Sequence, residues 1–172
     1  MPIPLQVLDF IILPQILSIL TFPGIILREF WHKLLCERAG VVVHEVCYFQ
    51  LGAQTGYVKH DTPKTYNQSF IIIAGPYLIG TVLAVFLFLL ARLLTGNILY
   101  GVLIWLGSSS AMNCFPSYPD ADTLWTETFR HRSLLARINL PIALIIKLSS
   151  LLRTVWFGLA YVALLWQVAI RL

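Results

Sequence analysis

Arg28, Glu29 and His32 are ionisable residues inside an apolar stretch of the sequence, where charge calls for a functional explanation. On a helix, residues 28 and 32 share one face, and Glu29 lies about 100° round from Arg28. With His at position 28, the segment would read H-E-x-x-H, the pattern in which two His bind zinc and the Glu activates water. Arg28 occupies the position of the first His, and its guanidinium has no lone pair for a metal.

The composition is typical of a polytopic membrane protein. Of 172 residues, 58% are hydrophobic and 12% charged, and the mean hydropathy is +0.79. The net charge of +4 could indicate a nucleic-acid partner, but the basic residues lie mostly between apolar runs, where they determine topology. We therefore expect membrane lipid, and not nucleic acid, as a partner. The three cysteines fit neither a disulfide framework nor a Cys-x-x-Cys metal site, which favours buried or cytosolic thiols.

The apolar runs predict one integral membrane domain over residues 1–172, mainly α, with about four transmembrane helices. Pro23 should break or kink the first span, and the motif helix should end near Gly40. Between the first and second spans, β-branched residues and a turn signal predict a membrane-associated β-hairpin. The expected elements are a first span at 5–38, the hairpin at 41–60, a second span at 69–94, a third at 98–112, a loop and short helix at 113–133, and a C-terminal helical region at 134–172 that forms one or two helices.

The basic residues also predict an orientation in the membrane. They concentrate in the segment after the first span and in the segment after the third. Because cytoplasmic loops carry an excess of Lys and Arg, we expect the loops 39–68 and 113–138 to be cytoplasmic.

Four features, in this order, resemble the small membrane-embedded zinc metalloproteases of the site-2 protease type. They are the helix from Phe22 to His32, the hairpin at 41–60, the Ala74-Gly75-Pro76 step at the start of the second core helix, and Asp120 after a third hydrophobic helix. The resemblance covers about residues 20–125. It implies that His32 and Asp120 are metal ligands, that Glu29 is the general base and that the hairpin guides substrate.

Arg28 is the largest departure from this family pattern. A unit charge about 4 Å from a divalent ion costs about 8 kcal/mol at an effective dielectric near 20, so zinc and Arg28 compete for one site. Our hypothesis is that Arg28 takes the metal's place and pairs with Asp120 or Glu29, which keeps the buried carboxylates compensated. The competing interpretation is that the charged residues at 28–33 lie at a helix end and snorkel to the membrane interface.

Three more residues have two interpretations each. Asp122 is either an alternative to Asp120 as the ligand-like carboxylate or the N-cap of the following helix. His44 and His60 flank the hairpin, and they are either auxiliary ligands or ordinary polar residues of a partly exposed hairpin.

Three functions are compatible with these patterns. The leading interpretation is a pseudoenzyme, a catalytically inactive site-2-protease-like membrane protein without a metal cofactor, which binds or stabilises another membrane protein. The first alternative is an active intramembrane zinc endopeptidase in which His32 and Asp120 hold zinc with a third ligand from elsewhere, and Glu29 is the general base. The second alternative is a small structural subunit of a larger membrane complex.

Overall fold

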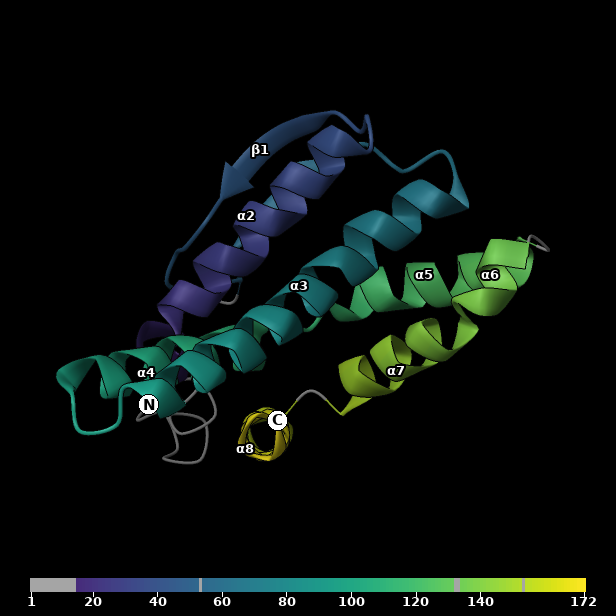
Figure 1. Cartoon of the computed structure of the whole chain (residues 1–172). Helices are drawn as coiled ribbons and strands as arrows, with labels where there is room; N and C mark the ends of the chain where they lie inside the picture. Colours follow the sequence, from purple (N-terminus) through teal and green to yellow (C-terminus); the bar gives the residue numbers. More distant parts are fainter. Residues whose placement is uncertain (1–14, 53, 132–133, 153) are drawn as a thin grey trace, which may run out of the picture.

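The computed structural model describes residues 15–52, 54–131, 134–152 and 154–172, most of which are helical (Figure 1). Residues 15–20 are helical, and the chain turns at Thr21 before helix α2, Phe22–Arg38. Pro23 lies in the first turn of α2, where its missing N–H is not needed, and Gly40 follows its end with a φ of 73°. The motif helix is confirmed, although residues 5–14 of the predicted first span lie outside the described residues.

The predicted hairpin is also confirmed. Strands β1, Val43–Cys47, and β2, Tyr57–His60, pair antiparallel, with Cys47 opposite Tyr57 and Val43 opposite His60. Both strands contact α2, and the hairpin runs beside this helix (Figure 1). The hairpin therefore brings His60 back toward the middle of the motif helix.

Helix α3, Tyr66–Leu93, is the central helix, since it contacts α2, α4, α5, α7 and α8. It begins three residues earlier than the predicted second span at 69–94. Thr65 and Gln68 form a capping box, in which each side chain accepts from the other's backbone N–H, and this fixes the earlier start. Helix α4, Ile98–Asn113, matches the predicted third span to within one residue.

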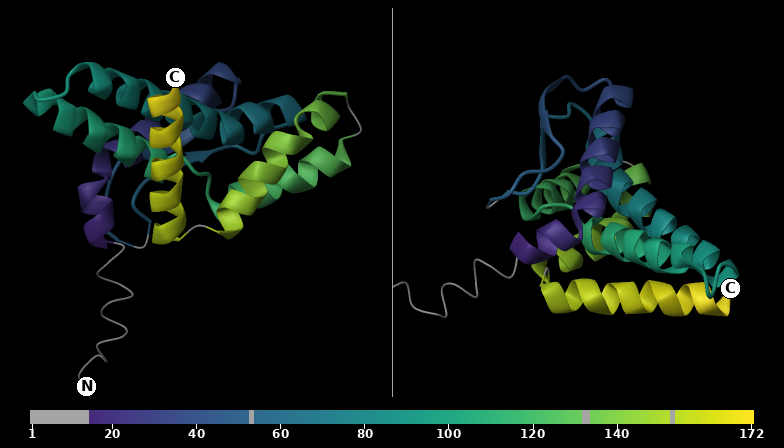
Figure 2. Two further views of the ribbon diagram at one scale, coloured as in Figure 1. Left: turned by 60° about the horizontal axis from the view of Figure 1, so that its bottom comes forward. Right: turned by 90° about the vertical axis from the view of Figure 1, so that its left-hand side faces the viewer.

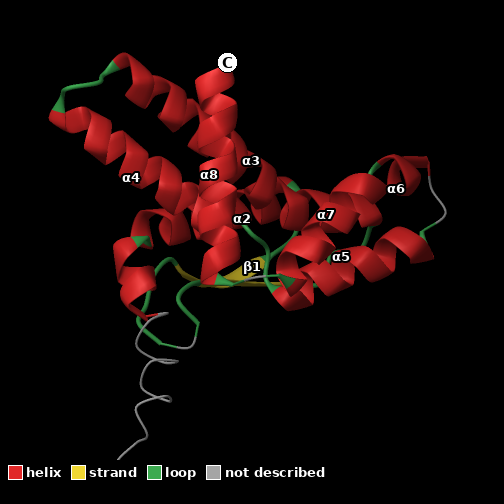
Figure 3. Cartoon of the chain, turned by 90° about the horizontal axis from the view of Figure 1, so that it is seen from below, coloured by secondary structure: helices red, strands yellow, loops and turns green. Residues whose placement is uncertain are grey.

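The C-terminal half differs most from the sequence prediction. The segment 113–133, expected as a loop and a short helix, is mostly helix, because Ser117 caps helix α5, Tyr118–Arg130, and Pro119 lies in its first turn. The C-terminal region, predicted as one or two helices, contains three in its described residues: the short helix α6, Leu134–Ile138, then α7, Leu140–Leu151, and α8, Val155–Arg171. Helices α5 and α7 pack side by side, and α8 crosses α3 and α4 (Figures 2 and 3).

Helix α3 is the one helix in the described ranges that is long and apolar enough to cross a membrane by itself. A second crossing is possible if α4 and α5, which meet at a bend of 57°, count as one broken span. Helices α7 and α8 are apolar but shorter. Length and composition thus support one or two membrane-spanning helices, fewer than the four that the sequence predicted.

A close contact between α2 and α4 fixes where the motif helix begins. The Gly24 N–H donates to Ser109 Oγ over 2.7 Å, and a Cβ on Gly24 would lie 1.9 Å from the Ser109 carbonyl oxygen. Ser109 Oγ in turn donates to the carbonyl of Thr21. Only glycine permits this approach, which sets the position of Arg28 one helical turn further along.

Candidate functional site

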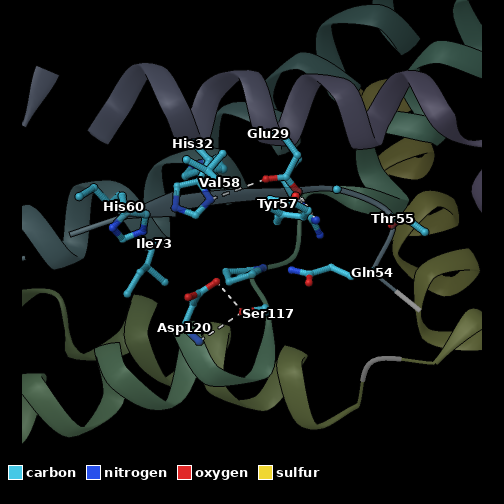
Figure 4. Close-up of a pocket in the computed structure, with 15 residues that line it drawn as sticks. Glu29, His32, Gln54, Thr55, Tyr57, Val58, His60, Ile73, Ser117 and Asp120 are labelled. Atoms are coloured by element: carbon cyan, nitrogen blue, oxygen red, sulfur yellow. Dashed lines mark hydrogen bonds and ion pairs between the residues drawn. The ribbon is translucent and has the colours of Figure 1, made fainter. Parts of the chain in front are cut away.

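A pocket of about 270 Å³ lies between α2, the hairpin, α3 and α5. Glu29 and His32 reach it from α2, His60 from β2, and Asp120 from α5 on the opposite side (Figure 4). Its polar lining residues include Arg28, Glu29, His32, Gln54, His60 and Asp120. The fold therefore gathers the residues of the degenerate motif, one hairpin histidine and the expected aspartate around one cavity.

Arg28 and Glu29 form an ion pair in this pocket. The Glu29 side chain is only 2% exposed, and its Oε1 accepts from Arg28 Nε over 2.9 Å and from the terminal Nη2. The loop before β2 packs against the Glu29 side chain, because a Cβ on Gly56 would lie 2.9 Å from Glu29 Cγ. Of the two partners expected for Arg28, the structure has Glu29.

His32 lies between this ion pair and the hairpin. Its Nδ1 is 3.9 Å from the second carboxylate oxygen of Glu29, and its ring centroid is 5.2 Å from that of His60. Its Nε2 is buried and has no hydrogen-bond partner among the described residues. A buried imidazole nitrogen without a hydrogen-bond partner requires an explanation, and a bound ion or molecule at this nitrogen is one such explanation.

Asp120 and Asp122 point to different places, although they are two residues apart. Asp120 lines the pocket in the first turn of α5 and accepts a hydrogen bond from Ser117 Oγ (Figure 4). Asp122 is exposed and pairs with Lys147 on α7. Its predicted role as the N-cap is wrong, because Ser117 has that position.

His44 and His60 also separate. His44 is exposed, and its Nε2 is 2.8 Å from Asp61 Oδ1, away from the pocket lining. His60 packs against His32 inside the pocket. Of the two possible auxiliary ligands, the fold brings only His60 to the motif helix.

The exposed part of the hairpin carries its own polar cluster. Glu45 on β1 accepts from Lys59 and from the Tyr57 hydroxyl, both on β2. These hydrogen bonds lower the pKa of Glu45 and raise the pKa of Lys59 and of Tyr57. The cluster therefore links the side chains of β1 and β2 across the hairpin.

Three potential metal ligands meet where α2 and β2 touch. The ligand atoms of His32, Cys36 and His60 all lie within 4.8 Å of one another. Cys36 is fully buried, and the three cysteines are free thiols in the described chain. From the sequence alone, Cys36 is expected to be a buried or cytosolic thiol outside any metal site. Its spacing of four from His32, which places both on one helix face, was the signal that could have found it.

The residues present do not fit the zinc site that the family resemblance implies. That site needs a ligand at position 28, and Arg28 offers only donors, of which Nε and Nη2 donate to Glu29. His32 and Asp120 remain, but the general base of the motif accepts hydrogen bonds from a cation. The pocket therefore brings together the residues of the motif, but the residue at position 28 cannot bind a metal.

Comparison of this chain with protein-family models, with curated proteins and with solved structures found no match in any of the three. The resemblance to site-2 proteases therefore rests on the motifs and their order alone.

Proposed function

We propose that this chain is a membrane-embedded pseudoprotease of the site-2 type, which binds or stabilises another membrane protein through its pocket and hairpin. The single observation that carries the proposal is the ion pair between Arg28 and Glu29. In an active H-E-x-x-H site, the Glu must accept a proton from a metal-bound water. Here the same carboxylate is buried and compensated by the guanidinium at the first ligand position.

The membrane setting of the proposal rests on the apolar surface. Helix α3 meets the requirements for a span, and it exposes large apolar side chains such as Val82, which is 69% exposed, and Phe86. Trp156 on α8 is 80% exposed. Monomeric soluble proteins rarely expose so much contiguous apolar surface, whereas lipid covers it at little cost. We propose a multi-pass arrangement, with the segments 39–68 and 113–138 on the cytoplasmic side.

A photo-crosslinking amino acid at Gln54 tests the proposed docking surface, because Gln54 is exposed and lines the pocket. The expected result is a crosslinked membrane protein of intact length, in the same amount when Glu29→Gln is added. The matched control is the same amino acid at Leu51, which is 61% exposed on the same loop but outside the pocket lining. An adduct that accumulates only in Glu29→Gln would be a trapped substrate and would contradict the proposal.

An active zinc endopeptidase with a rearranged site is the second candidate. The observation in its favour is the cluster of His32, Cys36 and His60, since it offers the third ligand that a site based on His32 and Asp120 would need. In that case Glu29→Gln would abolish proteolysis, and Arg28→His would change activity only modestly. The pseudoprotease has no such dependence on Glu29.

A further inference from the structure

We propose that His32, Cys36 and His60 bind a zinc ion that fastens the hairpin to α2, one helical turn beyond the position of the family's metal. The inference goes beyond the proposed function, because this ion is a structural tie between two elements. It does not need Arg28, and it does not need Glu29 as a base.

The donor set is the first support. One thiolate and two imidazoles are a common ligand set for zinc, which holds sulfur at about 2.3 Å and nitrogen at about 2.0 Å. The three ligand atoms lie within 4.8 Å of one another, so they need to approach by about 1 Å to share one tetrahedral ion. Small rotations of side chains on two rigid elements supply such a shift.

The hydrogen bonds of the two histidines are the second support. His60 Nδ1 is 2.7 Å from the carbonyl oxygen of Asp61, which can only accept, so Nδ1 carries the hydrogen. In the neutral ring, Nε2 then has a free lone pair. Metal-binding histidines commonly donate their other ring N–H to a carbonyl in this way, which fixes the tautomer that can bind metal. His32 turns Nδ1 toward Glu29 and leaves the buried Nε2 without a partner in the described structure.

The charges around the cluster suit a divalent ion. On binding, the Cys36 thiol releases its proton to solvent and zinc bonds to the thiolate, which leaves one positive charge from the ion and its three ligands. Asp120 lines the same pocket and offers a compensating carboxylate. The Arg28 and Glu29 pair is neutral as a unit, so it adds no net repulsion.

The pocket also supplies a route and a fourth position. It is lined by both histidines, whereas Cys36 lies beneath, packed with Val41 and Ile72. A zinc ion entering through the pocket would meet the histidines first, and water or Asp120 could complete the tetrahedron on the open side. Once bound, the ion would tie β2 to α2 at residues that are 24 and 28 positions apart along the chain.

Elemental analysis of the full chain, purified in detergent and equilibrated with zinc and then dialysed, tests the site. We expect about one zinc per chain in the wild type and more than about 100-fold weaker binding in Cys36→Ser and in His60→Ala. That loss exceeds the roughly 10- to 100-fold cost of removing a group that only hydrogen-bonds a metal ligand. The matched controls are Cys47→Ser and His44→Ala, which alter a cysteine and a histidine of β1 outside the cluster and should keep the metal. Replacement by cobalt should give a thiolate-to-metal charge-transfer band that Cys36→Ser removes.

Two results would overturn the proposal. One is wild-type protein without stoichiometric zinc or without the cobalt charge-transfer band, a measurement that needs no variant to fold. The other is zinc that is lost in Asp120→Asn and His32→Ala but retained in Cys36→Ser and His60→Ala, which would locate the ion at the family's position. Neither experiment measures proteolysis or partner capture, so its failure is distinguishable from a failure of the pseudoprotease proposal.

Discussion

The Arg28 guanidinium donates to the carboxylate of its chain neighbour Glu29, with Nε 2.9 Å from Oε1 and the carboxylate almost completely buried. Adjacent residues on a helix usually point in different directions, so this pairing requires both side chains to turn into the same pocket. The hairpin closes over Glu29 and leaves Arg28 as its partner in the described structure. The position where the motif would hold a metal therefore holds a compensating cation.

Removing the guanidinium should destabilise the fold. Arg28→Ala leaves a buried carboxylate without its cation, and we expect a loss of about 3 kcal/mol in equilibrium unfolding in mixed micelles. Adding Glu29→Gln should recover most of this loss, because the neutral amide needs no counter-charge. The control is Lys33→Ala, which removes an exposed pair with Glu37 and should cost less than about 0.5 kcal/mol. Equal losses in Arg28→Ala and Lys33→Ala would contradict this account of the pair.

The contact between α2 and α4 should not tolerate a side chain on Gly24. Gly24→Ala would push a methyl group into the backbone of Ser109, and we expect a loss of about 3 kcal/mol or more, or failure to fold. Gly101→Ala is the matched helical control, since its added Cβ would lie more than 4 Å from the described atoms outside the adjoining backbone of its own helix. That change should stabilise the protein by up to about 1 kcal/mol. A tolerated Gly24→Ala would show that the helices can separate freely.

The hairpin cluster should make the pairing of its strands depend on pH in two windows. The folded pKa of Glu45 lies below its ordinary value of 4.5, so its contribution is complete above that value and is lost as the pH falls through the folded pKa. The folded pKa of Lys59 lies above 10.5, so its contribution is complete below that value and is lost as the pH rises through the raised pKa. Amide-proton exchange of β1 and β2 measures both, and Lys59→Met should weaken the acid-side dependence. An unchanged profile in that variant would contradict the assignment.

The exposed apolar face of α3 should face lipid. Val82→Lys would place a charge near the middle of the helix, and we expect it to reduce membrane insertion by about 3 kcal/mol in a glycosylation-based insertion assay. Leu93→Lys, at the end of the same helix and 80% exposed, is the control and should insert nearly normally because its ammonium can reach the interface. Equal insertion of the two variants would contradict a lipid-facing α3.

The sequence predicted those parts of the fold that depend on local signals. Pro23 and Gly40 mark the two ends of α2, and β-branched residues mark the hairpin. The early start of α3 was missed because the capping box of Thr65 and Gln68 lies in a polar segment that resembles a linker. The start of α5 was missed because Asp122 was considered as the cap and Ser117 was not.

The candidate site was predicted where its residues share one helix and missed where the fold joins two elements. Arg28, Glu29 and His32 follow from helical spacing alone. His60 reaches His32 only because β2 returns along α2 in one particular register, which no local pattern specifies. Helical spacing places Cys36 on the same face as His32, but a lone thiol in an apolar helix is usually a packing residue, so the sequence did not single it out.

The most direct test of the central claim is proteolysis by the purified chain in liposomes that contain single-span membrane proteins as potential substrates. The wild type, Glu29→Gln and Arg28→His are compared with and without zinc. The pseudoprotease account predicts no cleavage by the wild type and no difference between it and Glu29→Gln. Cleavage by the wild type that Glu29→Gln abolishes would contradict the account, because the paired carboxylate would then be working as a general base.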